Sequence, residues 1–220
     1  MNTKKKFAVV LSGCGVYDGA EIHEATLTMY AIVKQAAIYE IFAPDIEQYH
    51  VINHITGSVM NEKRNVLVES ARIARGKIHN LKEFKAENFD ALIFPGGFGA
   101  AKNLSTFAFD GENCAVNKDV ATAIIKMHEL RKPIGALCIS PVILSKVLKN
   151  VEVTIGQDAG TTKKIENMGA VHKKTSQGEV CIDIKNNLFT TPCYMLDSDI
   201  SQIGDGALNI VNAILKTLNN

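Results

Sequence analysis

Short apolar runs alternate along the chain with segments of helical periodicity. Residues 7–11, 39–43, 90–94 and 133–137 form apolar runs of strand length, and residues 90–94 ("DALIF") are continuously apolar after the aspartate. Apolar residues recur at spacings of three and four over residues 20–35, 65–75, 120–130 and 143–148, which predicts helices. Strands that alternate with helices indicate an α/β fold with a mostly parallel, doubly wound sheet.

Three further elements complete the pattern. Residues 50–55 read as a short edge strand, residues 180–184 and 187–191 as a late hairpin, and residues 206–218 as a C-terminal helix. The chain has no repeat, no low-complexity segment and no linker. We therefore expect a single domain over residues 1–220.

The amino-acid composition excludes some classes of binding partner for the protein. Lys and Arg number 24 against 23 Asp and Glu, so no basic face is implied and nucleic acid is excluded as a partner. No apolar segment approaches the length that spans a bilayer, and the N-terminus lacks the apolar core of a signal peptide, so we expect no membrane partner and a cytoplasmic location. The five cysteines are scattered without a C-x-x-C spacing, so we expect no metal site.

Three strand ends carry unusual residues. The strand at residues 7–11 feeds a glycine-rich turn, "SGCGVYDG", and the strand at 90–94 ends in "PGG". The strand at 133–137 ends at Cys138. Since ligands of open α/β sheets bind outside the carboxyl ends of the strands, the three ends are expected to meet at one crevice.

The first glycine turn allows a rival interpretation. Gly13, Gly15 and Gly19 resemble a dinucleotide fingerprint, but the third glycine comes one residue late. The following helix opens with Glu21 and Glu24, which would repel a pyrophosphate, so nucleotide binding is the weaker reading. Both carboxylates lie on one side of the helix. If that side faces the crevice, a carboxylate points towards the thiol.

Cys138 admits two readings. A lone cysteine is most simply a small buried hydrophobe. However, it stands where a strand passes into a helix, whose positive end lowers a thiol pKa, so we expect a pKa below about 8.5 and the most reactive of the five thiols. The N–H of Ile139 and a glycine N–H of "PGG" would together bind an oxyanion.

Longer blocks of the sequence resemble a known family. "DALIFPGGFGAAKNLS" and "KPIGALCISP" resemble the DJ/PfpI branch of the class I glutamine amidotransferase-like superfamily. More narrowly, "LSGCGVYDGAEIHE", "NVLVESARIARG", "TIGQD" and "TTPCYML" are similar to the ElbB proteins (enhancing lycopene biosynthesis protein B, glyoxalase-like). The blocks run from about residue 7 to residue 197.

The resemblance implies a flavodoxin-like three-layer sandwich, a homodimer and no cofactor. By motif position it implies that Cys138 is the nucleophile and that Glu24 hydrogen-bonds its thiol. It further implies an oxyanion hole made by Gly97 and Ile139. Glu21, Gly15, Asp158 and Cys193 are secondary candidates for the pocket.

The sequence departs from the hydrolytic relatives at the histidine. Ile139 follows the cysteine, and Gly156 stands where several relatives have a histidine. Amide hydrolysis needs a histidine that first takes the proton of the nucleophile and then gives a proton to the amine leaving group. An aldehyde has no leaving group. The favoured hypothesis is a weakly active, glutathione-independent glyoxalase that converts a small aldehyde, glyoxal, to glycolate. The alternative is a thiol-based redox sensor or a small-molecule-binding protein with little turnover.

Overall fold

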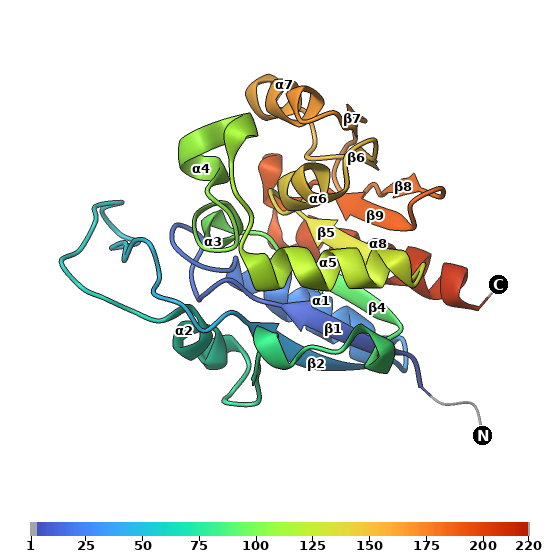
Figure 1. Cartoon of the computed structure of the whole chain (residues 1–220), viewed down its shortest axis with the longest axis horizontal. Helices are drawn as coiled ribbons and strands as arrows, with labels where there is room; N and C mark the ends of the chain where they lie inside the picture. Colours follow the sequence, from blue (N-terminus) through green and yellow to red (C-terminus); the bar gives the residue numbers. More distant parts are fainter. Residues whose placement is uncertain (1–3, 220) are drawn as a thin grey trace.

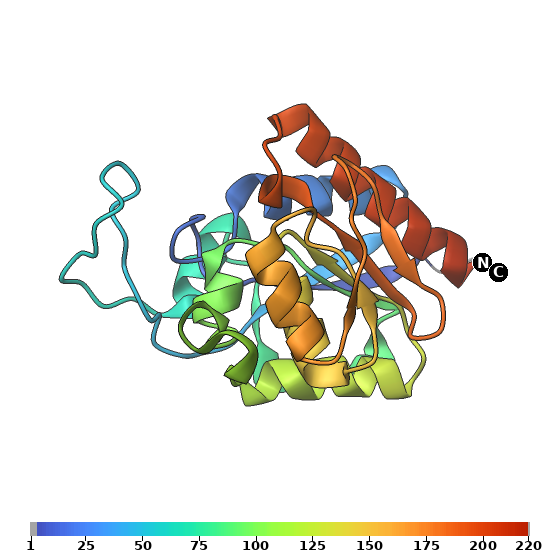
Figure 2. The same ribbon diagram turned by 90° about the horizontal axis from the view of Figure 1, so that it is seen from above.

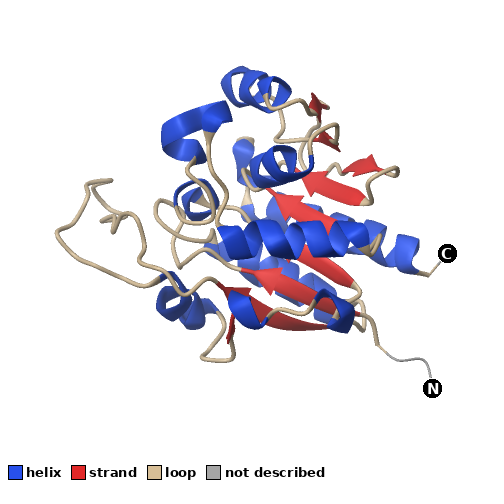
Figure 3. Cartoon of the chain, in the orientation of Figure 1, coloured by secondary structure: helices blue, strands red, loops and turns tan. Residues whose placement is uncertain are grey.

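The central sheet has seven strands in the order β3-β2-β1-β4-β5-β9-β8. The computed structural model describes residues 4–219. The strands are β1 (Lys6–Val10), β2 (Ile38–Ala43), β3 (His79–Asn80), β4 (Ala91–Phe94), β5 (Ile134–Leu137), β8 (Cys181–Asp183) and β9 (Leu188–Thr191). All neighbours pair in parallel except β8 and β9, which pair antiparallel. The predicted α/β class, parallel sheet and late hairpin are confirmed (Figure 1, Figure 3).

Helices cover both faces of this sheet. The principal helices are α1 (Ile22–Lys34), α2 (Val66–Ile73), α3 (Phe98–Lys102), α4 (Phe107–Asp110), α5 (Lys118–Glu129), α6 (Pro141–Leu148), α7 (Ala159–Asn167) and α8 (Ile200–Leu218). Helices α1 and α8 pack together on one face, and α5 lies on the other (Figure 2). Each face encloses its own buried apolar cluster, so the sheet is the middle layer of three.

The strands are buried because both of their faces are covered. In β1, β4 and β5, Phe7, Ile93 and Ile134 are fully buried. This explains why the sequence of these strands is continuously apolar rather than alternating. A small parallel pair, β6 (Glu152–Val153) with β7 (Val171–His172), carries α7 and lies beyond the main sheet.

The predicted edge strand at residues 50–55 is wrong. Ile52 forms only an isolated antiparallel bridge with Val59, inside a long loop that projects from the body of the protein (Figure 1, Figure 2). The strand beside β2 is β3, and residues 50–55 pair with none of the seven strands of the sheet. Val51 and Ile52 are buried within the loop, and Ile55 is 96% exposed.

Helix α8 begins six residues before the predicted start, at Ile200 rather than residue 206. Gly204 and Gly206 weaken the apolar pattern there, and the helix is fixed instead by its N-terminal cap. Asp199 accepts from the N–H of Ser201 at 2.8 Å and from that of Gln202 at 2.9 Å, and the Gln202 side chain accepts from Asp199 N–H at 3.0 Å. Although α8 is long, no helix within residues 4–219 has both the length and the apolar character to cross a membrane.

The cap of α8 gives a test of the fold. Replacing Asp199 with Ala removes the acceptor for two N–H groups and is expected to lower the free energy of unfolding by about 1 kcal/mol. Urea denaturation measures the change. Asp199→Asn keeps the acceptor and should retain most of the stability, and Asp205→Ala removes an exposed carboxylate from the same helix. Equal losses for Asp199→Ala and Asp205→Ala would contradict the role of the cap.

Candidate active site

Cys138 is the first residue after β5 and stands in a left-handed backbone conformation. Its φ is 58°, which non-glycine residues rarely adopt, and its N–H donates to Thr191 O at 2.9 Å. The hydroxyl of Ser140 donates to Pro95 O at 2.7 Å and ties this corner to the turn after β4. Pro141 then opens α6. The local strain is typical of a nucleophile held at a sharp strand-to-helix turn.

Two backbone amides converge on the sulfur of Cys138. The N–H groups of Gly97 and Ile139 both hydrogen-bond the thiol sulfur. Gly97 has φ 98°, and a Cβ there would lie 2.4 Å from Glu21 N and 2.4 Å from Gly19 O. Only glycine fits this position, and its amide is thereby aimed at the thiol.

Glu24 lies at the floor of the site and is fully buried. One carboxylate oxygen, Oε2, accepts from Gly96 N–H at 2.9 Å, and the other, Oε1, accepts from Tyr194 N–H at 3.3 Å. The same carboxyl also hydrogen-bonds the thiol of Cys138. Glu24 reaches this place because α1 begins beneath the turn after β4, where Glu21 N–H donates to Gly96 O at 2.9 Å.

Gly96 packs against both Glu24 and Cys138. A Cβ at Gly96 would lie 2.4 Å from Cys138 Cβ, 2.6 Å from Glu24 Oε2 and 2.9 Å from Cys138 Sγ. No side chain fits there. The close approach of carboxyl and thiol therefore depends on glycine at this position.

Carboxyl and thiol oppose each other's ionisation. Burial raises the pKa of Glu24 to about 8, with a further rise from the nearby Glu21 carboxylate. Burial, followed by the charge of Glu24, raises the pKa of Cys138 well above its ordinary value, although the Gly97 and Ile139 amides act in the opposite direction. Near neutral pH each group therefore keeps its own proton, the carboxyl is the first to lose its proton, near pH 8, and the pair titrates as one unit.

The predicted lowering of the Cys138 pKa is therefore wrong. The sequence identified the amides that lower it, including the one at the start of the next helix. It did not show that the thiol is only 7% exposed and in contact with a buried carboxyl. Desolvation outweighs the amides.

A cavity of about 410 Å³ opens above Cys138. Its walls are mostly apolar and include the side chains of Val16, Phe98, Phe107, Ile139 and Met195. Polar groups occupy its rim, namely Asp158, Thr161 and Lys164 of the α7 region, with Tyr194. The cavity is thus an apolar chamber with one thiol at the floor.

The structure sorts the predicted site residues into groups. Cys138, Ile139, Gly97 and Asp158 line the cavity. The remaining candidates do not line it: Glu24, Glu21, Gly15 and Cys193.

These four residues occupy three different places. Glu24 and Glu21 lie behind the thiol, and Glu21 caps α1 by accepting from Glu24 N–H at 2.7 Å. Asp158, which lines the cavity, also caps a helix, because its carboxylate accepts a hydrogen bond from Thr161 N–H at 2.7 Å. Gly15 packs against His54, and Cys193 lies below the cavity floor.

Sequence reasoning missed most of the cavity wall. Phe98 directly follows "PGG", and Tyr194 directly follows Cys193, so neighbours of recognised motifs were available as signals. No recognised motif adjoins Phe107 or Lys164 in the sequence. They reach the cavity through α4 and α7, short elements that the apolar pattern did not predict.

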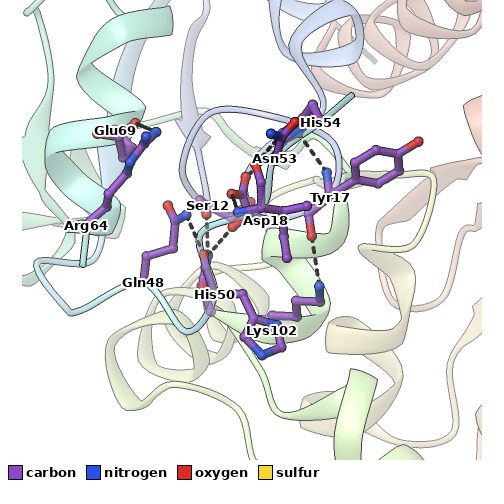
Figure 4. A network of polar contacts seen from close by, with 12 residues as sticks. Ser12, Tyr17, Asp18, Gln48, His50, Asn53, His54, Arg64, Glu69 and Lys102 are labelled. Carbon is purple, nitrogen blue, oxygen red and sulfur yellow. Dashed lines mark hydrogen bonds and ion pairs between the residues drawn. The ribbon is translucent and has the colours of Figure 1, made fainter. Parts of the chain in front are cut away.

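A polar network holds the glycine turn that precedes α1 (Figure 4). Asp18, only 4% exposed, accepts from Ile52 N–H at 2.6 Å, and His54 Nε2 accepts from Tyr17 N–H at 3.2 Å. Lys102 Nζ donates to Tyr17 O at 2.9 Å. The projecting loop and α3 together fix the turn, and with it Val16 at the cavity wall.

This packing disfavours the nucleotide interpretation. A Cβ at Gly15 would lie 2.6 Å from His54 Nε2, and one at Gly19 would lie 2.2 Å from Cys14 N, so protein atoms already fill the space at these glycines. The first N–H groups of α1 face the carboxylate of Glu21 rather than an open anion site. As for metals, no cluster of three or more His, Cys, Asp or Glu side chains suited to an ion occurs in the described part of the chain.

Fold and site together define the class of protein. A parallel sheet with a thiol at the sharp turn after β5, a buried glutamate and a "PGG" amide constitutes the flavodoxin-like DJ-1/PfpI fold with its cysteine corner. No protein-family model matches the chain. The chain is 48% identical to the mitochondrial ES1 protein homolog of Rattus norvegicus, over 97% of this chain and 84% of the rat protein.

A human relative agrees. Mitochondrial glutamine amidotransferase-like class 1 domain-containing protein 3 of Homo sapiens is 49% identical over 96% of this chain and 82% of its own length. The chain therefore belongs to the family of the ES1 and glutamine amidotransferase-like class 1 domain-containing proteins.

Solved structures show the same fold. The crystal structure of an isoprenoid biosynthesis protein with amidotransferase-like domain from Ehrlichia chaffeensis has a TM-score of 0.90 and 35% identity, covering 96% of this chain and 99% of that one. DJ-1beta of Drosophila melanogaster has a TM-score of 0.57 and 16% identity, covering 96% and 91% of the two chains, and shares the fold alone.

The relatives overturn the expected cytoplasmic location. The rat, human and Danio rerio proteins, which are 48%, 49% and 37% identical to this chain, all carry the word mitochondrial in their names. The expectation rested on the absence of a recognisable signal peptide, and that absence does not separate the cytoplasm from an organelle. A cytoplasmic assignment is therefore withdrawn.

The raised pKa of Glu24 predicts how the stability of the fold depends on pH. Because Glu24 keeps its proton in the folded state up to about pH 8 and loses it near its ordinary value when unfolded, the folded state binds more protons between these limits. The free energy of unfolding should therefore fall as pH rises from about 5 to 8, by at most about 1.4 kcal/mol per pH unit.

Glu24→Gln isolates this contribution because glutamine does not titrate. Urea denaturation at several pH values is expected to show wild-type stability falling relative to Glu24→Gln across this window. Parallel curves for the two proteins would mean that Glu24 is already ionised in the folded state.

Proposed function

We propose that the chain is a cofactor-free, glyoxalase-like enzyme of the ElbB type, which converts small α-oxoaldehydes to hydroxy acids. The observation that carries the proposal is the buried Glu24 carboxyl in hydrogen-bond contact with the Cys138 thiol, at the floor of a cavity. A single domain over residues 1–220, of which 1–3 and 220 lie outside the described part, and a homodimer belong to the same proposal.

The first step would form a hemithioacetal. Glu24 accepts the thiol proton, and the sulfur of Cys138 attacks an aldehyde carbon of glyoxal. The developing oxyanion receives hydrogen bonds from the Gly97 and Ile139 N–H groups and then takes the proton from Glu24. The raised pKa of Glu24, about 8, suits a group that both accepts and returns a proton near neutral pH.

The later steps would move a proton between two carbons. Glu24 removes the proton from the carbon bonded to sulfur and delivers a proton to the neighbouring carbon. The hydroxyl proton on the first carbon passes to the oxygen of the second, which leaves a thioester of glycolate. Water then attacks the thioester carbonyl, the carbon–sulfur bond breaks, and the thiol regains its proton. The net reaction adds one water to glyoxal and yields glycolate.

The site supports aldehyde chemistry over amide hydrolysis. An amine leaving group requires a positioned proton donor, usually a histidine. Among the described residues that line the cavity there is no histidine. His23 hydrogen-bonds Tyr194 through Nδ1 at 2.8 Å on the exposed side of α1, away from the thiol.

A redox-sensing role is the second candidate. Cys193 lies in the same buried cluster as Cys138, and its pKa is raised by burial and by the neighbouring Glu24 and Cys138. A second buried thiol is not needed for the aldehyde reaction. It would be useful if Cys138 were oxidised.

Glu24→Gln should separate proton transfer from thiol reactivity. Glutamine cannot act as the base, so glycolate production from glyoxal is expected to fall by about 10²-fold or more. It also removes the negative charge beside the sulfur, so the pH midpoint of Cys138 alkylation by iodoacetamide should shift downward. Cys138→Ala should abolish glycolate formation, and Cys181→Ala serves as the matched thiol control. Near-normal turnover by Glu24→Gln would assign the proton transfer to another group.

The cavity predicts a preference among aldehydes. About 410 Å³ of mostly apolar space exceeds what glyoxal fills, so phenylglyoxal is expected to show the higher kcat/KM. Phe98→Ala should lower kcat/KM for phenylglyoxal by about 10-fold, the scale of a lost apolar contact, with little effect on glyoxal. Phe109→Ala, which removes an aromatic ring outside the cavity wall, is the control. Equal losses on both substrates would place Phe98 in structural support of the site.

A further inference from the structure

Cys138 and Cys193 occupy neighbouring strand ends. Strands β5 and β9 pair in parallel with Leu137 opposite Thr191, and Cys138 N–H donates to Thr191 O at 2.9 Å. Cys193 follows Thr191 by two residues, through Pro192, so the two cysteines stand at the adjacent ends of paired strands. They are close enough for a charge on Cys138 to raise the pKa of Cys193.

Both side chains are buried in one apolar cluster, which lies between the sheet and helices α1 and α8. Both residues have left-handed backbones, with φ 58° and 41°. The residue after Cys193 donates its N–H to Glu24 Oε1 at 3.3 Å, so the two cysteines flank the same carboxyl.

The two thiols differ in their access to small molecules. Cys138 lines the cavity, whereas Cys193 does not and is only 3% exposed. A solute that enters the cavity reaches Cys138 first. Cys193 lies behind it, beside helix α8, where a Cβ on Gly206 would lie 3.4 Å from its sulfur.

From this arrangement we propose that Cys193 is a resolving thiol, which forms a disulfide with Cys138 when hydrogen peroxide oxidises the site. The inference does not depend on the aldehyde reaction. It assigns a chemical role to a cysteine that the proposed aldehyde mechanism leaves unused.

The chemistry balances in two steps. The thiol of Cys138 loses its proton to the Glu24 carboxylate, its sulfur attacks one peroxide oxygen and the O–O bond breaks. The departing hydroxide takes the proton from Glu24 and becomes water. The sulfur is thereby oxidised to sulfenic acid and the peroxide is reduced. Cys193 then loses its proton to Glu24 and attacks the sulfenic sulfur, so that an S–S bond forms and an S–O bond breaks. The departing hydroxide takes the proton from Glu24, and the sum is two thiols and one peroxide to one disulfide and two waters.

The resolving step competes with further oxidation. A sulfenic acid with no thiol at hand proceeds to sulfinic acid, which ordinary thiols do not reverse. A thiol on the adjacent strand end intercepts it. The disulfide removes the Cys138 nucleophile from the cavity, and a dithiol reductant restores it.

Mass spectrometry of the whole chain tests the proposal. The protein is treated with one equivalent of hydrogen peroxide, remaining thiols are blocked with N-ethylmaleimide, and the chain is digested. We expect the wild type to lose two of its five free thiols and the mass of two hydrogen atoms, with a cross-linked peptide that joins Cys138 to Cys193. Dithiothreitol should reverse all of these changes.

Variants sharpen the outcome. With two equivalents of hydrogen peroxide, Cys193→Ala should gain two oxygen atoms at Cys138 while the wild type stays reducible by dithiothreitol, and Cys181→Ala, which removes another buried thiol, should behave as wild type. Sulfinic acid at Cys138 of the wild type with Cys193 unmodified would overturn the proposal. So would a disulfide to Cys14, or an unchanged oxidation product in Cys193→Ala. Because the wild-type result alone decides the question, instability of a variant does not leave it open.

Discussion

The contact between the Glu24 carboxyl and the Cys138 thiol is the interaction on which the rest of the site depends. Both groups are buried and each disfavours ionisation of the other. The contact persists because neither group is charged near neutral pH and because amides of Gly96, Gly97, Ile139 and Tyr194 supply hydrogen bonds to the pair. A thiolate stabilised only by a helix N-terminus would be simpler. In this site the Glu24 carboxyl, with a pKa of about 8, exchanges a proton near neutral pH.

The sheet topology brings these groups together. Strands β1, β4, β5 and β9 are parallel neighbours, so their carboxyl ends form one edge, and each end contributes a turn to the site. The turn after β4 is the central one. It hydrogen-bonds the start of α1 on one side and the Cys138 corner on the other. Changes at Gly96 would therefore disturb acid, nucleophile and oxyanion donors at once.

The sequence predicted the parts of this arrangement that local chemistry determines. The buried strands appear as apolar runs, Cys138 and Ile139 follow from their places at a strand end, and the family resemblance singles out Gly97 within "PGG". The sequence did not predict the direction of the Cys138 pKa shift, because the burial of the thiol depends on chain segments that are far away in the sequence. The segment at residues 50–55 illustrates the same limit. Its pattern suits a strand, but the strand beside β2 is β3, and Ile52 bridges only Val59 within the projecting loop. The apolar cavity wall depends on α4, which has four residues, and on α7, in which only Ile165 is buried, so neither shows a clear apolar period.

The wide spacing of the site residues along the chain has a consequence for how the protein reaches its native state. Glu24, Gly96, Cys138 and Tyr194 come together only after four parallel strands have paired across long sequence separations. Non-local parallel pairing of this kind is slow, since loop closure must precede the contacts that reward it. Until β9 docks beside β5, Cys138 lacks Thr191 as a partner and its thiol is an ordinary exposed one. The reactive centre is therefore completed late, and a nascent chain presents separate, unmatched thiols rather than a working site.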